Sequence, residues 1–292
     1  MLALIAGRGA LPGAVARAQA DMPLIASLSG HIPDGLDVDI SFRIEHLGSF
    51  LRVLQARGVR EVCFCGGVTR PVIDPNEIDA LTAPLVPALA GAVAGGEDSA
   101  LRAIVALFEA SGFLVRGADE LAPGLLPASG VATNGSLPDG VTDQVALADQ
   151  VLAQQAAQDL GQACVIRGAV VIAREDARGT DAMLRDLSTG HLSSATGDRV
   201  DVAGGAQDGV ADWLSGPVTE TRAHARGGTV FKAPKPGQDR RVDLPTIGPG
   251  TAMRAAEAGL DGIVIARGGV MVLDQPQVLA ILNRMEMFLW VR

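Results

Sequence analysis

The chain has 292 residues, 48% of them hydrophobic and 20% charged, which is the composition of a folded globular protein of one or two domains rather than of a disordered chain. A formal net charge of −9 and the lack of tyrosine argue against a nucleic-acid partner, because such binding rests on cationic contacts to phosphate and on aromatic stacking. No apolar stretch reaches the roughly 18 residues of a membrane-spanning helix. The three cysteines and four histidines show no spacing typical of a zinc site or a disulfide framework.

The first 120 or so residues alternate between short apolar runs and helical patterns. The opening run ends at Gly7 and lacks a basic flank, so it predicts a strand and not a signal peptide. We expect strands at residues 2–6, 23–27 and 61–65, and helices at 11–20, 47–57, 83–94 and 98–110. Strands separated by helices predict an α/β fold with a parallel, Rossmann-like sheet.

Two glycine turns follow predicted strands, Gly7-Arg8-Gly9 and Gly66-Gly67. The carboxyl ends of parallel strands share one edge, where ligands bind in open α/β sheets, so both turns are candidate ligand loops. A dinucleotide fingerprint is incomplete, because Pro12 stands where a third glycine is needed and no acidic residue closes the second strand. A tight strand-to-helix turn and a general anion site remain the alternatives. Arg70, just after the second turn, is either a phosphate partner or a solvated loop residue.

Prolines and glycines between residues 119 and 142 deny both a helix and a central strand, which marks a domain boundary. We therefore predict a Rossmann-like domain at 1–128, a linker at 129–141 and a distinct C-terminal α/β domain at 142–292. Within the C-terminal domain we expect helices at 143–160, at 251–258 and from 276 onward, and strands at 163–173, 229–233, 262–266 and 270–273. The polar, glycine-rich stretch 188–228 is predicted to be an insertion.

The densest chemistry lies in residues 232–251, KAPKPGQDRRVDLPTIGPGT, here called the cationic segment. It gathers four cations in an acidic chain, namely Lys232, Lys235, Arg240 and Arg241. Its prolines exclude a helix interior, so we expect a stiff, extended backbone on which Arg241 and Asp243 point the same way. Lysine and arginine suit phosphate groups, and Thr251 is a candidate N-cap. A solvated charged loop is the competing interpretation.

A second polar cluster, residues 178–184, follows the expected strand at 163–173. Thr180 is a candidate N-cap with Asp181 in the first helical turn; alternatively, Asp181 binds a hard cation such as Mg²⁺, which prefers carboxylate oxygens and is commonly shared with phosphates. Asp243 is the other candidate oxygen donor. The sequence has no Walker A loop, so a phosphate-processing hydrolase here would use another site.

Four segments together resemble the LpxI-type UDP-2,3-diacylglucosamine pyrophosphatases: IAGRGALP (5–12), CFCGGVTRP (63–71), GTDAML (179–184) and KAPKPGQDRRVDLPTIG (232–248). The resemblance runs through nearly the whole chain in order. It implies two lobes of distinct fold with substrate held between them. The implied reaction hydrolyses UDP-2,3-diacylglucosamine to 2,3-diacylglucosamine 1-phosphate (lipid X) and UMP, with Mg²⁺, in lipid A biosynthesis, through attack of water at the β-phosphorus.

The resemblance also implies roles for single residues. Asp243 is implied to be catalytic, as a metal ligand or by orienting the attacking water. Asp181 is the second expected metal ligand, on the carboxylate chemistry described above. Substrate contacts are implied for Ala10, Gly67, Val68, Thr180, Asp181, Lys232 and Arg241. Arg8 stands where a glycine is usual in the family, Gly67 stands where an asparagine is common, and the stretch 188–228 is longer than typical.

The implied enzyme is cytoplasmic and touches the inner membrane only peripherally, because its substrate is amphipathic. The sequence leaves the oligomeric state open, and a homodimer is the state that the resemblance suggests. Two other functions stay open. One is a nucleotide-sugar or dinucleotide oxidoreductase that uses Gly7 and Gly9, and the other is a protein that binds lipid or nucleotide without turnover.

Overall fold

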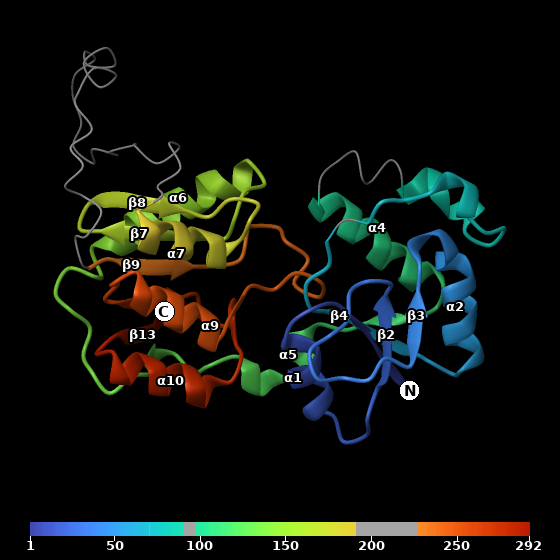
Figure 1. Ribbon diagram of the computed structural model, residues 1–292, viewed down its shortest axis with the longest axis horizontal. Coiled ribbons are helices and arrows are strands. Elements are labelled where there is room, and N and C mark those ends of the chain that lie inside the picture. The colour runs from blue at the N-terminus through green and yellow to red at the C-terminus, as the bar shows by residue number, and fades with distance from the viewer. Residues whose placement is uncertain (70, 90–96, 191–226) are drawn as a thin grey trace, which may run out of the picture. The chain divides into compact units, whose positions relative to one another are not determined.

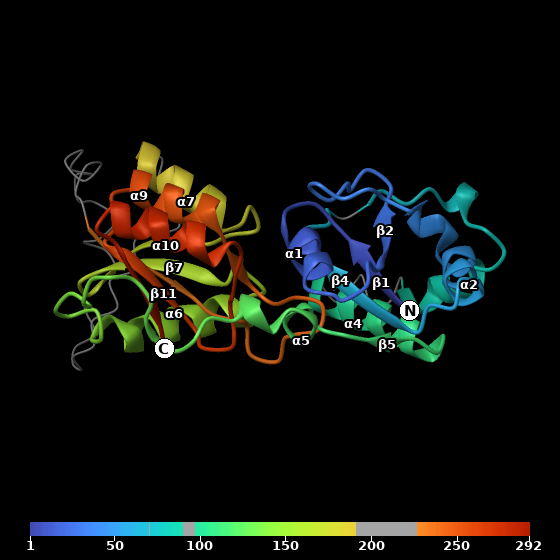
Figure 2. The same cartoon turned by 90° about the horizontal axis from the view of Figure 1, so that it is seen from below.

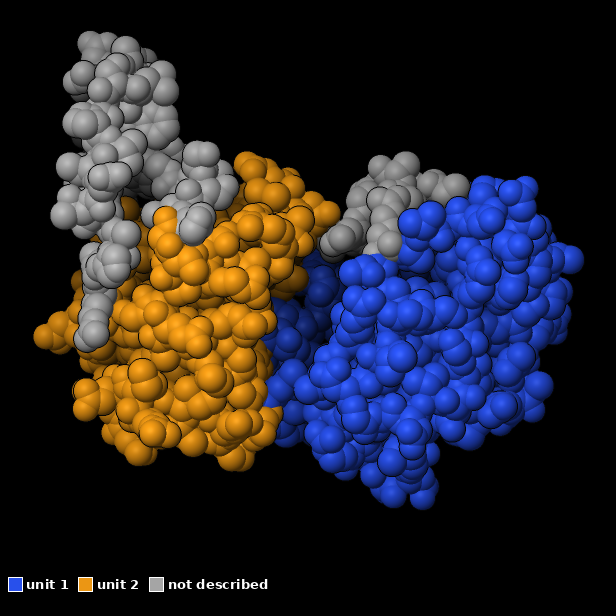
Figure 3. Space-filling model, viewed as in Figure 1, with its two compact units in different colours: residues 1–126, 237–246, 271–273 blue, residues 127–236, 247–270, 274–292 orange. Residues whose placement is uncertain are grey.

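The computed structural model describes residues 1–69, 71–89, 97–190 and 227–292 (Figure 1). Contacts divide the chain into two compact units (Figure 3). Unit 1 comprises residues 1–126, 237–246 and 271–273, and unit 2 comprises residues 127–236, 247–270 and 274–292. These units differ from the contiguous domains expected from the sequence, because residues 237–246 and 271–273 pack with the N-terminal sheet.

Unit 1 contains a five-stranded sheet in the order β3-β2-β1-β4-β5, in which every neighbouring pair is parallel. Its strands are β1 (Leu2–Ala6), β2 (Leu24–Leu28), β3 (Ile40–Phe42), β4 (Glu61–Cys65) and β5 (Leu114–Val115). The expected strands at 2–6 and 61–65 are confirmed at both ends, and the expected strand at 23–27 is displaced by one residue. The strands β3 and β5 were not expected, because they are too short to show a pattern. The α/β class with a parallel sheet is confirmed.

Helices cover both faces of this sheet. They are α1 (Leu11–Arg17), α2 (Leu47–Ala56), α4 (Glu97–Ala110) and α5 (Ala118–Leu121), with 3₁₀ turns η1 (Ile44–His46), η2 (Pro75–Glu77), η3 (Ala83–Leu85) and η4 (Pro123–Leu125). The expected helix at 83–94 begins in η3, and its residues 90–94 lie outside the described part of the chain.

Alternate residues of each strand serve opposite cores, as the two-residue period of a strand requires. Ala3 of β1 packs in the cluster that includes Phe50 of α2 and Phe108 of α4. Leu4, the next residue along β1, packs in a second cluster with Val15 of α1 and Ala118 of α5. Because both faces are buried, these strands appear in the sequence as continuous apolar runs.

Unit 2 contains a mixed six-stranded sheet in the order β6-β13-β11-β9-β7-β8. The central strands β9, β11 and β13 are parallel, whereas β6, β7 and β8 each pair in antiparallel fashion. The strands are β6 (Gly130–Val131), β7 (Ala163–Arg167), β8 (Val170–Arg174), β9 (Thr229–Lys232), β11 (Gly262–Ile265) and β13 (Phe288–Val291). The strand β13 was not expected from the sequence. Two short strands, β10 (Thr246–Ile247) and β12 (Met271–Val272), pair separately.

Figure 2 shows the helix α6 on one face of this sheet and three other helices on the opposite face. The former is α6 (Gln144–Ala157), and the latter are α7 (Thr180–Thr189), α9 (Pro249–Glu257) and α10 (Gln275–Arg284). The expected helices at 143–160, at 251–258 and from 276 are confirmed in type, with ends displaced by up to three residues. No helix in the described ranges is both long and apolar enough to cross a membrane.

The prediction of one long strand at 163–173 was wrong, because the segment folds as a hairpin of two strands, β7 and β8. Gly168 has a φ of +58°, a conformation that glycine adopts without strain, and it is the first residue of the two-residue turn between the strands. The expected insertion at 188–228 falls mostly on residues 191–226, which lie outside the described residues.

Candidate functional site

The two glycine turns of unit 1 meet at the carboxyl edge of its sheet, as expected, because β1 and β4 are neighbours. The amide of Arg8 donates to the carbonyl of Gly67, and the amide of Gly67 donates back to the carbonyl of Arg8, each at 2.8 Å. The amide of Gly7 donates to the carbonyl of Cys65, also at 2.8 Å. The two turns therefore form one backbone-bonded pair of loops, here called the glycine clasp (residues 7–9 and 66–67).

Glycine is required at two positions of the clasp. A Cβ at Gly7 would lie 2.5 Å from the carbonyl oxygen of Gly67, and Gly66 has a φ of +93° with the carbonyl oxygen of Gly7 only 2.7 Å from its own would-be Cβ. A Cβ at Gly67 would approach only the carbonyl oxygen of Arg8, at 3.9 Å. The position of Gly67 is therefore open to the asparagine that is common in the resembling family.

A third loop, after β2, is tied to the clasp through His31, whose side chain is buried. Its Nε2 accepts a hydrogen bond from the amide of Thr69 at 3.0 Å and lies 2.8 Å from the Thr69 hydroxyl. The guanidinium of Arg8 donates to the carbonyl of Gly30 at 2.8 Å. Sequence analysis did not single out His31; its only signal is a histidine directly after a buried strand. Ala10 and Val68, both expected to contact substrate, are exposed on these loops.

The cationic segment contains a turn at residues 239–243, so the prediction of an extended backbone at these residues was wrong. The amides of Val242 and Asp243 both donate to the carbonyl of Asp239 at 3.1 Å. Since the chain reverses here, the spacing of two residues does not align Arg241 with Asp243. The prolines stiffen the flanks of the segment but do not prevent the turn.

Two carboxylates hold the guanidinium of Arg241. Asp239 accepts from its Nε at 2.9 Å and from its Nη2 at 2.7 Å, and Glu109 of α4 accepts from its Nη1 at 2.6 Å. The hydrogen bonds with Arg241 lower the pKa of Asp239, and those with Asp239 and then Glu109 raise the pKa of Arg241. A diphosphate that binds Arg241 would have to compete with Glu109 for the guanidinium group.

Asp243 accepts a hydrogen bond from the side-chain amide of Gln238, and Gln238 is itself buried. This contact fixes the direction of the carboxylate that sequence analysis marked as catalytic. The neighbouring Arg240 forms an ion pair with Asp119 at 3.3 Å. Gln238 was missed from the sequence, although it stands inside the segment that carries the resemblance.

In unit 2 the expected residues Lys232 and Thr180 lie together. Lys232, at the end of β9, donates from Nζ to the Thr180 hydroxyl at 2.7 Å, and that hydroxyl donates to Oε1 of Glu175 at 2.7 Å. Thr180 is not the N-cap of α7, as one interpretation had it; the cap is Gly179, with a φ of +87°. Likewise Thr251 lies inside α9, which Gly248 caps.

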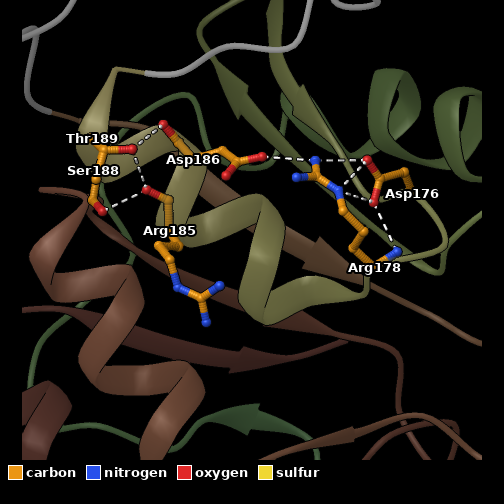
Figure 4. A network of polar contacts seen from close by, with 6 residues as sticks. All are labelled: Asp176, Arg178, Arg185, Asp186, Ser188 and Thr189. Atoms are coloured by element: carbon orange, nitrogen blue, oxygen red, sulfur yellow. Dashed lines mark hydrogen bonds and ion pairs between the residues drawn. The ribbon is translucent and has the colours of Figure 1, made fainter. Parts of the chain in front are cut away.

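Asp181 lies beside this group but is half exposed, with 52% of its side chain accessible, and forms an ion pair with Arg254 of α9 at 3.3 Å. A separate surface network anchors the start of α7 (Figure 4). There Arg178 bonds both Asp176 and Asp186, which lowers the pKa of Asp176 and raises that of Arg178. This network ties the loop before α7 to Asp186 within the helix.

The expected site residues thus fall into two sets. Unit 1 carries Ala10, Gly67, Val68, Arg241 and Asp243, and unit 2 carries Thr180, Asp181 and Lys232. Arg70 lies outside the described residues. In the described part of the chain, no three acidic, histidine or cysteine side chains gather as a metal cluster.

The chain thus combines a parallel α/β unit, which has glycine loops at its carboxyl edge, with a mixed-sheet unit, which holds a part-buried lysine–threonine–glutamate contact. Two family models match it. Residues 1–125 match the LpxI N-terminal domain, and residues 128–290 match the LpxI C-terminal domain. The chain belongs to the LpxI family. It is 35% identical over 297 aligned residues to the UDP-2,3-diacylglucosamine pyrophosphatase LpxI of Caulobacter vibrioides, an alignment that covers 98% of this chain and 95% of the relative.

Proposed function

We propose that this chain hydrolyses the pyrophosphate bond of UDP-2,3-diacylglucosamine, giving 2,3-diacylglucosamine 1-phosphate and UMP in lipid A biosynthesis. The observation that carries the proposal is the likeness to the Caulobacter pyrophosphatase over nearly the full length of both chains. The oxidoreductase alternative is not favoured, because the glycine clasp lacks the third glycine and the ribose-binding acid of a dinucleotide site.

The proposal gives each group a distinct task. Asp243 serves as the catalytic carboxylate that positions water or metal, and the side-chain amide of Gln238 orients it. Lys232 and Arg241 neutralise the diphosphate, and Arg241 does so by exchanging Glu109 for a phosphate oxygen. Local cations are needed because a chain of net charge −9 repels a dianionic diphosphate at long range.

The donor set is compatible with Mg²⁺, which is the proposed cofactor. Mg²⁺ is usually held by one or two carboxylates together with waters and substrate phosphates, and the half-exposed carboxylate of Asp181 is a ligand of this kind. Asp243 and Asp181 are the proposed ligands. When bound, the ion would act as a Lewis acid on the phosphoryl oxygens.

The finer features of the fold belong to the same proposal. The strand order 3-2-1-4-5 of unit 1 supports a Rossmann-like fold, because this is the order of the dinucleotide-binding sheet, in which ligands bind where the order reverses, between β1 and β4. Ala10, Gly67 and Val68 stand on the loops that follow these two strands. That substrate lies between the two lobes stays a prediction. A cytoplasmic location, transient contact with the inner membrane and a homodimer also stay predictions.

The decisive experiment measures UMP release from UDP-2,3-diacylglucosamine with Mg²⁺, with and without a chelator. We expect turnover that the chelator abolishes, and a loss of several orders of magnitude in Asp243→Ala with an unchanged melting temperature, as for removal of a site carboxylate. The matched control is Asp149→Ala, which should retain full activity. Asp149 is an exposed aspartate of α6 whose side chain pairs with Arg292. Substrate binding without UMP release would favour the binding protein instead, and normal turnover in Asp243→Ala would refute the catalytic role of Asp243.

A further inference from the structure

A buried carboxylate stands behind the expected substrate residues of unit 2. Glu175 follows β8 and is 8% exposed, and Thr180, which it contacts, is 7% exposed. Its Oε1 accepts from the Thr180 hydroxyl at 2.7 Å, and its Oε2 accepts from the amide of Gln162 at 2.6 Å. Both carboxylate oxygens are thus used as acceptors, which fits an ionised side chain.

These contacts fix the direction of the Thr180 hydroxyl. A threonine hydroxyl has one proton to donate, and here the proton goes to Glu175, so the lone pairs of the oxygen face the ammonium of Lys232 at 2.7 Å. The order is ammonium, hydroxyl, carboxylate, in which each group donates to the next. The negative charge at one end compensates the positive charge at the other, and this charge-assisted arrangement holds the long lysine side chain in one geometry.

The chain makes room for Glu175 at one specific place. A Cβ at Gly161 would come within 3.0 Å of the Cβ, Cγ and Cδ of Glu175, near the stem of the side chain rather than its flexible end. The adjacent Gln155 donates to the carbonyl of Glu175 at 3.0 Å and so holds its backbone as well. The position of the carboxylate is therefore determined from the side of the backbone and from the side of the hydroxyl.

We propose that Glu175 is a positioning residue which, through the Thr180 hydroxyl, holds the ammonium of Lys232 ready for the diphosphate. This rests on the proposed function, in which Lys232 binds that diphosphate. A lysine fixed in advance loses less side-chain freedom when the ligand arrives, so the benefit appears as affinity. On this account Thr180 serves Lys232, and its proton is committed to Glu175 rather than to the substrate.

The test is a double-mutant cycle between Glu175→Gln and Lys232→Gln. It is measured as the Kd of UDP, which carries the diphosphate without the glucosamine or its acyl chains, and as kcat/KM for UMP release. In the Lys232 background we expect Glu175→Gln to weaken UDP binding and to lower kcat/KM by about tenfold, whereas in the Lys232→Gln background the same change should alter UDP binding less than about twofold. Equal effects in both backgrounds, or no effect in the Lys232 background, would overturn the proposal, because a merely structural glutamate does not need the lysine.

Thr180 provides an arm that does not depend on whether Glu175→Gln folds. Thr180→Ser keeps the hydroxyl and should retain UDP affinity, and Thr180→Val removes it and should weaken UDP binding by about tenfold. Loss in Thr180→Ser as large as in Thr180→Val would contradict the role of the hydroxyl. The matched control is Asp186→Asn, an acid-to-amide change on the same helix. Asp186 pairs with Arg178, and its replacement should leave UDP binding unchanged.

The two proposals fail in different ways. If the wild-type chain binds UDP in a manner that depends on Lys232 and Glu175 but releases no UMP, the proposed function fails and the positioning role stands. If the wild-type chain releases UMP but the cycle shows no coupling, the proposed function stands and the positioning role fails.

Discussion

Arg241 lies between the carboxylates of Asp239 and Glu109, and its guanidinium bonds both at once. The bidentate contact with Asp239 is local to the turn, whereas Glu109 comes from α4 and 44% of its side chain is exposed. If Arg241 binds the diphosphate as proposed, Glu109 is therefore the partner that a phosphate group would displace at lower cost. A residue expected to bind substrate from its charge alone has in the structure a competing anion beside it.

Replacing Glu109 tests the role of Arg241. We expect Glu109→Gln to lower the KM for UDP-2,3-diacylglucosamine, because the competing carboxylate is gone, and Arg241→Ala to raise it. The melting temperature of Glu109→Gln should barely move, since exposed ion pairs contribute about 0–1 kcal/mol. Steady-state kinetics provide the measurement, with Glu120→Gln as the control for loss of an exposed ion pair with Arg116. An unchanged KM in both Glu109→Gln and Arg241→Ala would make Arg241 a structural residue.

Glu45 gives the clearest dependence on pH at the scale of one residue. It is buried, and hydrogen bonds from Arg43 and then from the amide of Asp74 lower its pKa from 4.5 to about 2. A carboxyl whose pKa is depressed in the folded state stabilises the fold fully above the unfolded value, and this stability is lost as the pH falls from about 4.5 to about 2. At neutral pH the contacts of the ionised Glu45 carboxylate therefore stabilise the fold.

We expect Glu45→Gln to unfold more readily than wild type at pH 6, and the gap between the two to narrow progressively below pH 4.5, the ordinary value for this carboxyl. Urea denaturation at several pH values measures it. Glu77→Gln is the control, because Glu77 meets the same Arg43 at 3.8 Å but is 52% exposed. A gap that stays constant down to pH 2.5 would show that packing, and not charge, is what Glu45 contributes; this window lies within the shift from 4.5 to about 2.

At the scale of elements, the glycine clasp joins the ends of two adjacent parallel strands. Its hydrogen bonds connect residues 8 and 67 in both directions, so neither loop can shift without the other. The loop after β2 joins this pair through the hydrogen bond from Arg8 to Gly30, and through His31, which bonds Thr69 just after the clasp. Three loops that are far apart in sequence therefore present their backbone and side chains as a single surface at the edge where α/β sheets bind ligands.

The clasp predicts unequal effects for two glycines that face each other. Gly7→Ala should destabilise the fold by about 2 kcal/mol or more, because its Cβ meets backbone that cannot move aside. Gly67→Ala should change stability by less than about 0.5 kcal/mol, because its Cβ enters open space. Thermal and urea denaturation measure both, and equal effects would show that the clasp opens without cost.

The elements that could be predicted are those with local causes. The strands β1 and β4 are buried on both faces and end at glycines, so their bounds followed from apolar runs alone. The hairpin of β7 and β8 was not predicted, although Arg167 and Gly168 interrupt the apolar run at the position of the turn; the positive φ of Gly168 identifies it. The turn at 239–243 was missed because it depends on the carbonyl of Asp239 rather than on the prolines nearby.

The candidate site was predictable in its residue types and not in its partners. Lys232, Thr180 and Asp243 carry recognisable chemistry. Glu175 and Gln238, which orient them, are ordinary polar residues in the sequence, and their importance comes from burial and contact. A sequence pattern shows which side chains can do chemistry, whereas only the fold shows which neighbours hold them.

At the scale of the whole molecule, the core of unit 1 includes residues from the far part of the chain. Leu244 and Met271 are buried in the same cluster as Leu4 and Val15, and the amide of Met271 donates to the carbonyl of Pro245 at 2.9 Å. The N-terminal sheet therefore depends for part of its stability on residues more than a hundred positions beyond residue 126.

Met271→Ala should weaken the N-terminal sheet although it lies late in the sequence. Because Met271 is 1% exposed, we expect a loss of about 2–5 kcal/mol, seen by hydrogen exchange as faster exchange in β1, β4 and α1 than in β7 and β9. Met253→Ala, on an exposed face of α9, is the control and should leave exchange unchanged. Faster exchange confined to unit 2 would contradict the assignment of Met271 to the core of unit 1.

This discontinuity also has a consequence for how the protein is made. Residues 1–126 emerge from the ribosome before Leu244 and Met271 have been synthesised. The delay is on the order of ten seconds at ordinary rates of translation. During that interval the nascent N-terminal sheet has an incomplete apolar layer on the side of α1 and α5. Its last folding step must therefore wait until Met271 has emerged from the ribosome, and until then this apolar surface is a binding site for chaperones.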